Sequence, residues 1–145
     1  MDIINAQLEL INKTNDLVII TKADNINYPS GPEIVWVNDA VLKTTKYEKN
    51  EIIGKTPRIL QGKDTSKETL KFIGECLNQR RDFKVELLNY DKFGRSYWIE
   101  FSVVYIKDQN GNIAYLGAIE RDISKIKAMN LKKKKKATTD PLTKV

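Results

Sequence analysis

The sequence predicts an α+β fold, in which a five-stranded antiparallel sheet carries short helices and one long helix on one face. Two strand-like runs precede a helical middle section, and three more follow it. The last two runs are joined by Asp108 to Gly111, whose Asn-Gly pair favours a hairpin. At 145 residues, the chain suits a single domain of ordinary size, flanked by a helix at each end.

Residues 1–13 are expected to form an N-terminal amphipathic helix. Ile4, Leu8 and Ile11 fall at positions i, i+4 and i+7, which places their side chains on one face of a helix. An apolar stripe of this kind needs a packing partner. The pattern leaves two partners open: the sheet of the same domain, or the same helix of a second protomer.

The first two strands are expected to be short. Leu17 to Thr21 is an apolar run rich in β-branched residues, and Ile34 to Val37 is a second. Between them, Asn25 to Pro32 gathers Asn, Pro, Ser and Gly, which is typical of a loop. Asn38 follows the second strand and is a residue type that caps helices well.

The middle of the chain is predicted to be helical. Apolar residues from Asp39 to Gly54 are spaced for short helices. Pro57 suits the first turn of another helix, where a missing backbone N–H costs nothing. Residues 66–79 are expected to form the long helix, because apolar side chains recur there at helical spacing, at Leu70, Ile73 and Leu77.

Three further strands are expected after the long helix. Residues 83–90, 96–106 and 112–119 are rich in β-branched and aromatic side chains. Lys92 to Gly94 separates the first two, and the Asn-Gly turn separates the last two. Short separators of this length join antiparallel neighbours, so these three strands should form consecutive hairpins.

The composition excludes several classes of site. There is no histidine and a single cysteine, Cys76, which excludes a His-ligated haem, a His-based catalytic triad, an internal disulfide and a cysteine metal cage. We expect no metal site and no catalytic residues. No apolar run approaches the roughly 18 residues of a membrane span, and no secretory signal is present, so a cytoplasmic protein is expected.

Residues 54–62, Gly-Lys-Thr-Pro-Arg-Ile-Leu-Gln-Gly, resemble the flavin-cradling segment of LOV photosensors, which runs G-x-N-C-R-F-L-Q-G. Pro57 takes the place of the photoactive cysteine, so the thiol adduct of that family cannot form at this position. Two more segments match LOV-type members, residues 87–94 and residues 115–117. Together with the order of elements, they identify residues 14–124 as similar to the PAS superfamily.

The resemblance implies a ligand pocket between the long helix and the sheet. Carried over residue by residue, it nominates as pocket candidates Thr21, Thr56, Pro57, Arg58, Leu60, Gln61, Leu70, Ile73, Leu77, Asn89, Ile99, Phe101 and Ile119. The same side chains also suit a filled core, so an empty core and a pocket with an unknown ligand stay open as alternatives.

The resemblance also bears on the cofactor. Arg58, Gln61 and Asn89 match a phosphate-binding arginine, a ribityl-chain glutamine and a ring-binding asparagine of the flavin site. The remaining polar contacts of that site are replaced, at Thr56, Gly74, Ile99 and Ile119. Because each lost hydrogen bond is worth about 0.5 to 1.5 kcal/mol net, these losses argue against FMN as the native ligand. Haem is disfavoured by the missing histidine, and the ligand stays unknown.

The C-terminal segment is expected to transmit a signal. Residues 121–124, Arg-Asp-Ile-Ser, resemble the D-I-T triplet that ends many PAS domains and opens an output helix. The transmission candidates are Asp122, Ile123, Ile126 and Met129. A basic linker helix is expected over residues 125–138. Residues 139–145 resemble the opening of a GGDEF domain, the diguanylate cyclase module, which implies an output of that kind further along the parent chain.

Positive charge is concentrated behind the domain. Residues 1–124 carry 17 basic and 18 acidic side chains, against 8 basic and one acidic in residues 125–145. The run Lys132 to Lys136 has no interleaved aromatic or arginine residues, which favours a solvated helix face over a nucleic-acid site. No nucleic acid and no membrane partner are therefore expected.

These observations lead to one principal hypothesis and two alternatives. The chain is expected to be a regulatory PAS module that binds a small ligand or mediates dimerisation, and that controls a C-terminal diguanylate cyclase. One alternative is a ligand-free scaffold that sets the spacing of output domains. The other is a cysteine-free flavin sensor driven by redox state or light. A homodimer is expected, with residues 1–13 and 122–136 contributing its interface.

Overall fold

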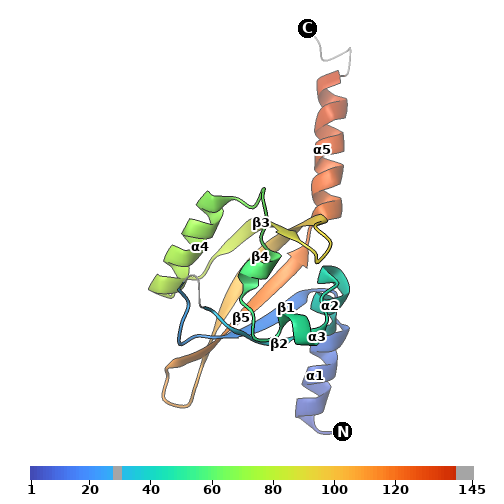
Figure 1. Cartoon of the computed structure of the whole chain (residues 1–145). Coiled ribbons are helices and arrows are strands. Elements are labelled where there is room, and N and C mark those ends of the chain that lie inside the picture. The colour runs from blue at the N-terminus through green and yellow to red at the C-terminus, as the bar shows by residue number, and fades with distance from the viewer. Residues whose placement is uncertain (28–30, 140–145) are drawn as a thin grey trace.

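The computed structural model describes residues 1–27 and 31–139, with side chains as far as Lys134. Its centre is a five-stranded sheet in the order β2-β1-β5-β4-β3, and every neighbouring pair is antiparallel (Figure 1). The strands are β1 Leu17–Lys22, β2 Ile34–Val37, β3 Lys84–Tyr90, β4 Ser96–Lys107 and β5 Ile113–Asp122. The predicted α+β fold with a five-stranded antiparallel sheet is confirmed.

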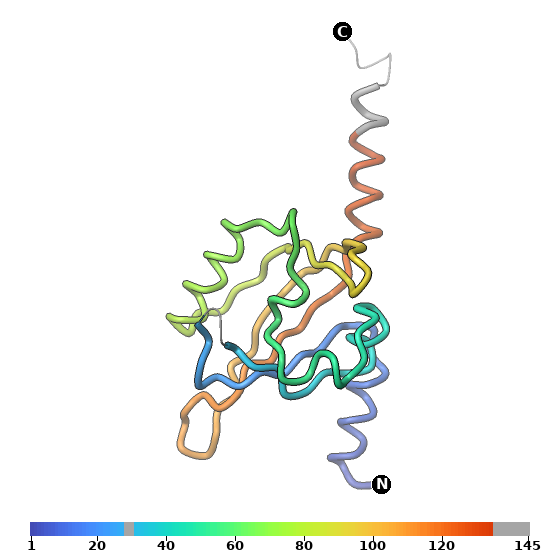
Figure 2. Tube along the Cα trace, in the orientation of Figure 1, coloured from blue at the N-terminus to red at the C-terminus, as the bar shows by residue number. Residues whose placement is uncertain are grey.

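The helices fall into two groups. The first group covers one face of the sheet, here called the inner face (Figures 1 and 2): α2 Asp39–Thr45, α3 Lys49–Ile52, the 3₁₀ helix η1 Pro57–Leu60, and α4 Lys67–Gln79. The second group consists of α1 Ile3–Lys13 and α5 Ser124–Thr139, which extend from the body of the domain toward the two termini (Figure 2). The GGDEF resemblance covers residues 139–145, and of these residues 140–145 are outside the described residues.

The helix boundaries follow from local capping chemistry. Ser66 precedes α4, and its side chain accepts a hydrogen bond from the backbone N–H of Thr69 at 3.1 Å. The helix ends at Arg80, which adopts a left-handed conformation with φ of 55°. Pro57 occupies the first turn of η1, as its missing N–H predicts. These signals explain why the long helix was recognisable from the sequence.

Asn38 joins three elements. Its side-chain oxygen accepts from the backbone N–H groups of Val18 and Val41, at 3.0 and 3.3 Å. Its amide nitrogen donates to the carbonyls of Ile11 and Asp16, at 2.8 and 2.9 Å. Asn38 therefore caps α2 and also ties that helix to β1 and to the end of α1.

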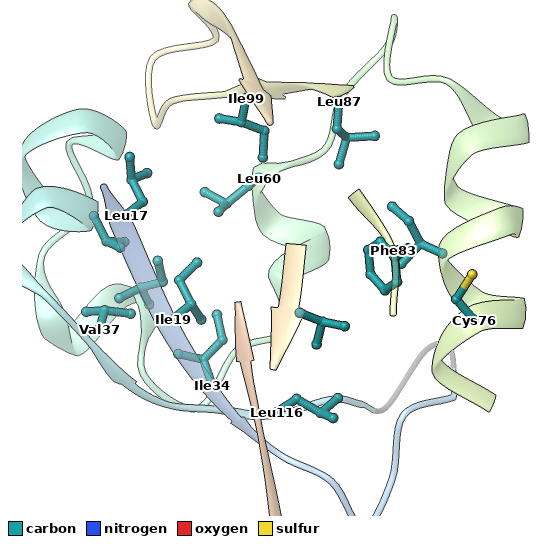
Figure 3. Packing of buried hydrophobic residues seen from close by; sticks show 14 of the residues in the cluster. Leu17, Ile19, Ile34, Val37, Leu60, Cys76, Phe83, Leu87, Ile99 and Leu116 are labelled. Carbon is teal, nitrogen blue, oxygen red and sulfur yellow. The ribbon is translucent and has the colours of Figure 1, made fainter. Parts of the chain in front are cut away.

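The hydrophobic core lies between the inner face of the sheet and the helices that cover it (Figure 3). Every second residue of a strand points into this layer, so Leu17 and Ile19 of β1 are fully buried while their neighbours are not. Leu60 of η1 and Cys76 of α4 enter the core from the helical side. Side chains do not fill the whole space between the sheet and the helices, and the unfilled part is a cavity.

β5 continues past the predicted end of its run at Ile119 and reaches Asp122. Its pairing with β4 extends through Asp122, which lies opposite Ile99. The strand thus delivers the chain directly to the start of α5. Among the described residues, no helix is both long and apolar enough to cross a membrane.

Candidate ligand cavity

A cavity of about 510 Å³ lies between the inner face of the sheet and the helical side of the core. Its walls come from β1, β3, β4 and β5 on one side, and from η1 and α4 on the other. Its volume falls within the range of small-molecule sites in proteins, which is about 300 to 1,000 Å³. The middle of the domain therefore has room for an organic ligand.

Ten of the thirteen nominated residues line this cavity. They are Thr21, Pro57, Arg58, Leu60, Gln61, Leu70, Ile73, Leu77, Asn89 and Phe101. These ten residues lie together around one cavity in the structure. That they bind a ligand stays a prediction. Gln61 is positioned by a short turn: the backbone N–H of Gly62 donates to the Thr65 hydroxyl, and that hydroxyl donates to the carbonyl of Leu88 on β3.

Three nominated residues lie elsewhere. Thr56 precedes η1 and does not line the cavity, although its carbonyl accepts from the N–H of Ile59. Ile99 faces inward but is fully buried in the core beside the cavity (Figure 3). Ile119 lies on the outer face of the sheet with 38% of its surface exposed, so its nomination is wrong.

The error at Ile119 is a slip of one residue along a strand. Side chains alternate between the two faces, so a shift of one position moves every residue to the opposite face. Leu116, Ala118 and Glu120 are the inward-facing residues of this part of β5, and all three line the cavity. The polar position that the resemblance placed at Ile119 is therefore occupied by Glu120.

Glu120 is a buried carboxyl group in the cavity wall. Only 3% of its surface is exposed, and its Oε1 has no hydrogen-bond partner among the described residues. Burial raises the pKa of the Glu120 carboxyl to about 8. At neutral pH the group is therefore mostly protonated, and it presents a carboxylic acid that can both donate and accept a hydrogen bond.

Two other buried hydroxyl groups lack a hydrogen-bond partner among the described residues, and of these Thr21 lines the cavity whereas Tyr97 of β4 lies outside its lining. Burial is the main cause that raises the pKa of Tyr97, and the charge of the nearby Glu120 is the second. Asn89 lowers this pKa in part, although it forms no well-aligned hydrogen bond with the Tyr97 hydroxyl. Buried polar groups normally have partners, so unsatisfied atoms at a cavity indicate that a ligand or water completes them.

Cationic side chains line the part of the cavity near α4. Lys67 and Lys71 lie one turn apart on that helix, and Arg58 comes from η1. Arg58 also donates a hydrogen bond to the carbonyl of Gly31 in the neighbouring loop. Neither lysine was nominated from the sequence, because the LOV resemblance places its second phosphate-binding arginine at Gly74. The spacing of Lys67, Lys71 and Gly74 was the available signal, since these positions share one face of a helix.

The junction between β5 and α5 is fixed to β4. The backbone N–H of Ile123 donates to the carbonyl of Trp98, and the N–H of Trp98 donates to the hydroxyl of Ser124, both at 2.9 Å. The carboxylate of Asp122 accepts from the N–H of Ser124 at 2.9 Å. Of the four transmission candidates, Asp122 and Ile123 lie in this junction, while Ile126 and Met129 are exposed further along α5.

A side-chain contact reinforces the junction. The Nζ atom of Lys127 lies 2.5 Å from the Glu86 carboxylate on β3 and 4.2 Å from the centre of the Trp98 ring. The contact holds the first turns of α5 against the outer face of the sheet. Within the described residues, no cluster of three or more His, Cys, Asp or Glu side chains could hold a metal ion.

Comparison with known proteins gives a consistent result. A family model described as "PAS domain" matches residues 15–125. Phototropin-2 of Oryza sativa is 33% identical over 94 residues, covering 65% of this chain and 10% of its own length. The "Blue-light photoreceptor" of Listeria innocua is 34% identical over 117 residues, covering 81% of this chain and 44% of its own length.

Solved structures agree with this result. The light-state structure of the blue-light photoreceptor Aureochrome1 LOV has a TM-score of 0.70 and 26% identity. That match covers 92% of this chain and 98% of the other. The present chain spans about a tenth of the length of the phototropins that it matches. What these similarities describe is thus a domain that occurs within much longer proteins.

Proposed function

Because this chain belongs to the PAS domain family, and has LOV-like relatives among blue-light photoreceptors, we propose that it senses a small organic ligand held in the central cavity. The observation that carries the proposal is the cavity of about 510 Å³, in whose wall Thr21 and Glu120 have buried, unpartnered polar atoms. A filled core would leave these two polar atoms without hydrogen-bond partners, whereas a bound ligand can supply the partners.

The cavity wall supports a particular kind of ligand. Its lining is mostly apolar, which favours a flat or largely hydrophobic body. Glu120 offers a hydrogen bond from the sheet side, while Arg58, Lys67 and Lys71 supply positive charge from the helical side. We infer a ligand that combines a ring system, bearing a hydrogen-bond acceptor, with an anionic group.

A flavin nucleotide is a second, more specific candidate. In the sequence, four replaced polar contacts argued against FMN. Three of them, Thr56, Ile99 and Ile119, do not line the cavity, so only the replacement at Gly74 still counts against a flavin. Lys67 and Lys71 supply cations on the same helix as Gly74, and Asn89 and Glu120 supply polar groups at the sheet. The residues present therefore fit a flavin, which when bound would supply redox or light-driven chemistry.

Such a flavin sensor would work without a cysteine adduct. Pro57 lines the cavity at the position that the LOV motif gives to the reactive thiol. Cys76 is buried in the core and does not line the cavity. Adduct formation requires a thiol beside the ring, so any light response would have to pass through hydrogen bonds to groups such as Glu120.

The proposed output runs through α5. The residues after this helix begin Asp140-Pro141-Leu142-Thr143, and their resemblance to a GGDEF opening supports a diguanylate cyclase as the regulated partner in the parent chain. We propose a cytoplasmic setting and no catalytic activity for the chain itself. A ligand can regulate such an output only if it binds two arrangements of the α5 junction with different affinity.

Lys127→Ala tests the α5 junction. The variant removes both the contact with Glu86 and the contact with the Trp98 ring. Because the pair is partly exposed, the loss should be at most about 1 kcal/mol, which corresponds to a several-fold faster hydrogen exchange in the first turns of α5. Lys125→Ala, on the same helix, is the control. Equal exchange rates in the two variants would contradict a role for this contact.

Gly74→Leu tests the ligand site. Gly74 lines the cavity, and an added Cβ would have no atom within 4 Å, so the leucine side chain can occupy the space of the ligand. Glycine inside a helix costs about 1 kcal/mol relative to alanine, so the ligand-free variant should be at least as stable as the ligand-free wild type. We expect a folded protein that retains no ligand.

The absorption spectrum of the protein, purified without added cofactor, separates the two candidates. Flavin bands in the wild type that disappear in Gly74→Leu would support the flavin sensor. A colourless wild type that releases another small molecule on heating would support the broader proposal and exclude flavin. A colourless wild type that releases nothing would contradict both, and would favour the ligand-free scaffold.

A further inference from the structure

The two halves of helix α5 differ in how they are held. Its inner half, residues 124–131, starts at the junction with β4 and is fixed to the sheet by the contact of Lys127 with Glu86. Its outer half, residues 132–139, begins with five consecutive lysines, Lys132 to Lys136. The first three of these lysines have exposed side chains. The helical state of the outer half therefore depends mainly on its own backbone and charges, because packing on the domain contributes little there.

The five lysines occupy every side of the helix. An α-helix has 3.6 residues per turn, so five consecutive positions are distributed around its whole circumference. No side of this segment is apolar or neutral, and it lacks the apolar stripe with which an amphipathic helix packs against a neighbour. The dimer interface expected over residues 122–136 would therefore have to end before Lys132.

No acidic side chain offsets this charge within the helix. Residues 123–139 contain no aspartate and no glutamate. Residues three or four positions apart are neighbours on a helix surface, and opposite charges at these spacings stabilise a helix whereas like charges destabilise it. In the outer half such pairs are all of like charge: Lys132 with Lys135, Lys132 with Lys136, and Lys133 with Lys136.

The helix macrodipole offsets only part of the repulsion. Positive charge is favourable at the C-terminal end of a helix, but this effect falls off within the last turn. The last turn of α5, residues 136–139, contains only one of the five lysines. Repulsion acts among all five of them. In the absence of screening, the balance of these charges is therefore unfavourable to the helix.

Dissolved salt controls this balance. The screening length is about 30 Å at 0.01 M ionic strength and about 3 Å at 1 M. Neighbouring positions on a helix surface lie about 5 to 6 Å apart, so the lysines repel one another at low salt and hardly interact at high salt. A short helix without packing partners is marginal in water, so a modest change in repulsion is enough to move its helix–coil equilibrium.

We propose that the outer half of α5 responds to ionic strength: it is helical when dissolved ions screen its lysines, and it unwinds when they do not. The inner half stays helical in both states, because the hydrogen bonds of Ile123, Ser124 and Lys127 hold it to the sheet. The outer half lies directly before the residues that resemble a GGDEF opening. Unwinding it would loosen the link between the domain and the proposed output.

This inference goes beyond the proposed ligand function. The charges that carry it lie on α5, and none of the five lysines lines the cavity. Occupation of the cavity by a ligand and unwinding of the outer half are measured on different parts of the chain. Either proposal can therefore fail without the other.

NMR of the full chain tests the proposal, because the chemical shift of each ¹³Cα atom reports the helix population at its residue. Spectra are recorded in about 10 mM and in about 500 mM sodium chloride. We expect the helix-to-coil ratio of residues 132–139 to rise about fivefold with salt, from the three like-charge pairs together. The shifts of residues 124–131 should not change. Shifts of residues 132–139 that are equal at both salt concentrations would overturn the proposal.

Lys132→Glu tests whether the lysine repulsion is the cause. The variant places a carboxylate three residues before Lys135 and four before Lys136, in the order that stabilises a helix. Its outer half should be helical at both salt concentrations, with less than about a twofold change in the helix-to-coil ratio. Lys125→Glu is the matched control, since it makes the same change of net charge in the inner half and should keep the wild-type salt dependence. A wild-type salt dependence in Lys132→Glu, or its equal loss in both variants, would contradict the inference.

Discussion

The wild-type protein is expected to lose stability as the pH rises from about 4.5 to about 8, and Glu120→Gln is expected to abolish this pH dependence. The folded protein raises the pKa of Glu120 from 4.5 to about 8, because the carboxyl is buried. In this interval the folded state holds a proton that the unfolded state has already released. The free energy of unfolding therefore falls as the pH rises.

The expected slope is about 1.4 kcal/mol per pH unit for this single group, and it levels off above the folded-state pKa. The contribution of Glu120 to the free energy of unfolding is fully present below pH 4.5, and it is lost as the pH rises through about 8. Glutamine keeps the shape of the side chain and cannot release the proton, so the variant should lose this slope. Urea unfolding at several pH values measures it. Parallel curves for the two proteins would show that Glu120 is ionised in the folded state.

Asn38→Ala is expected to destabilise the domain by about 3 to 5 kcal/mol. The Asn38 side chain is fully buried and makes four hydrogen bonds, to Ile11, Asp16, Val18 and Val41. Its removal takes a hydrogen-bond partner from three partly buried backbone groups, the carbonyls of Ile11 and Asp16 and the N–H of Val18, and each unpaired group costs about 1 to 3 kcal/mol. The N-cap of α2 is lost at the same time.

Chemical denaturation provides the measurement for this variant, and Asn50→Ala provides its control. Asn50 is an exposed asparagine on α3, so its replacement should change stability by no more than about 0.5 kcal/mol. Hydrogen exchange should also increase in α1, since its last turn is anchored to Asn38. Equal losses in the two variants would mean that the buried amide has no special structural role.

The sequence predicted the order and type of the elements well because each carries its own local signal. Ser66 and Pro57 stand at helix starts, and the Asn-Gly pair at residues 110–111 lies in the last turn. These signals depend only on backbone chemistry within a few residues. Strand alternation likewise predicted buried positions such as Leu17 and Ile19.

The site was harder to predict because it depends on register and on distant segments. Aligning a motif placed Ile119 in the pocket, whereas the inward alternation of Leu116 and Ala118 leads to Glu120. Starting from the buried residue Leu116 and taking every second residue of the strand would have identified Glu120 as inward-facing. Tyr97 joins this polar group only through strand pairing, which no local pattern reveals.

Native mass spectrometry of the purified wild-type protein and of Gly74→Leu tests most directly whether the cavity holds a ligand. We predict that the wild type carries a bound small molecule, seen as added mass that is lost on denaturation, and that Gly74→Leu shows the mass of its own chain alone. A wild type that also shows only the mass of its chain, or a variant that carries the same added mass, would contradict the account.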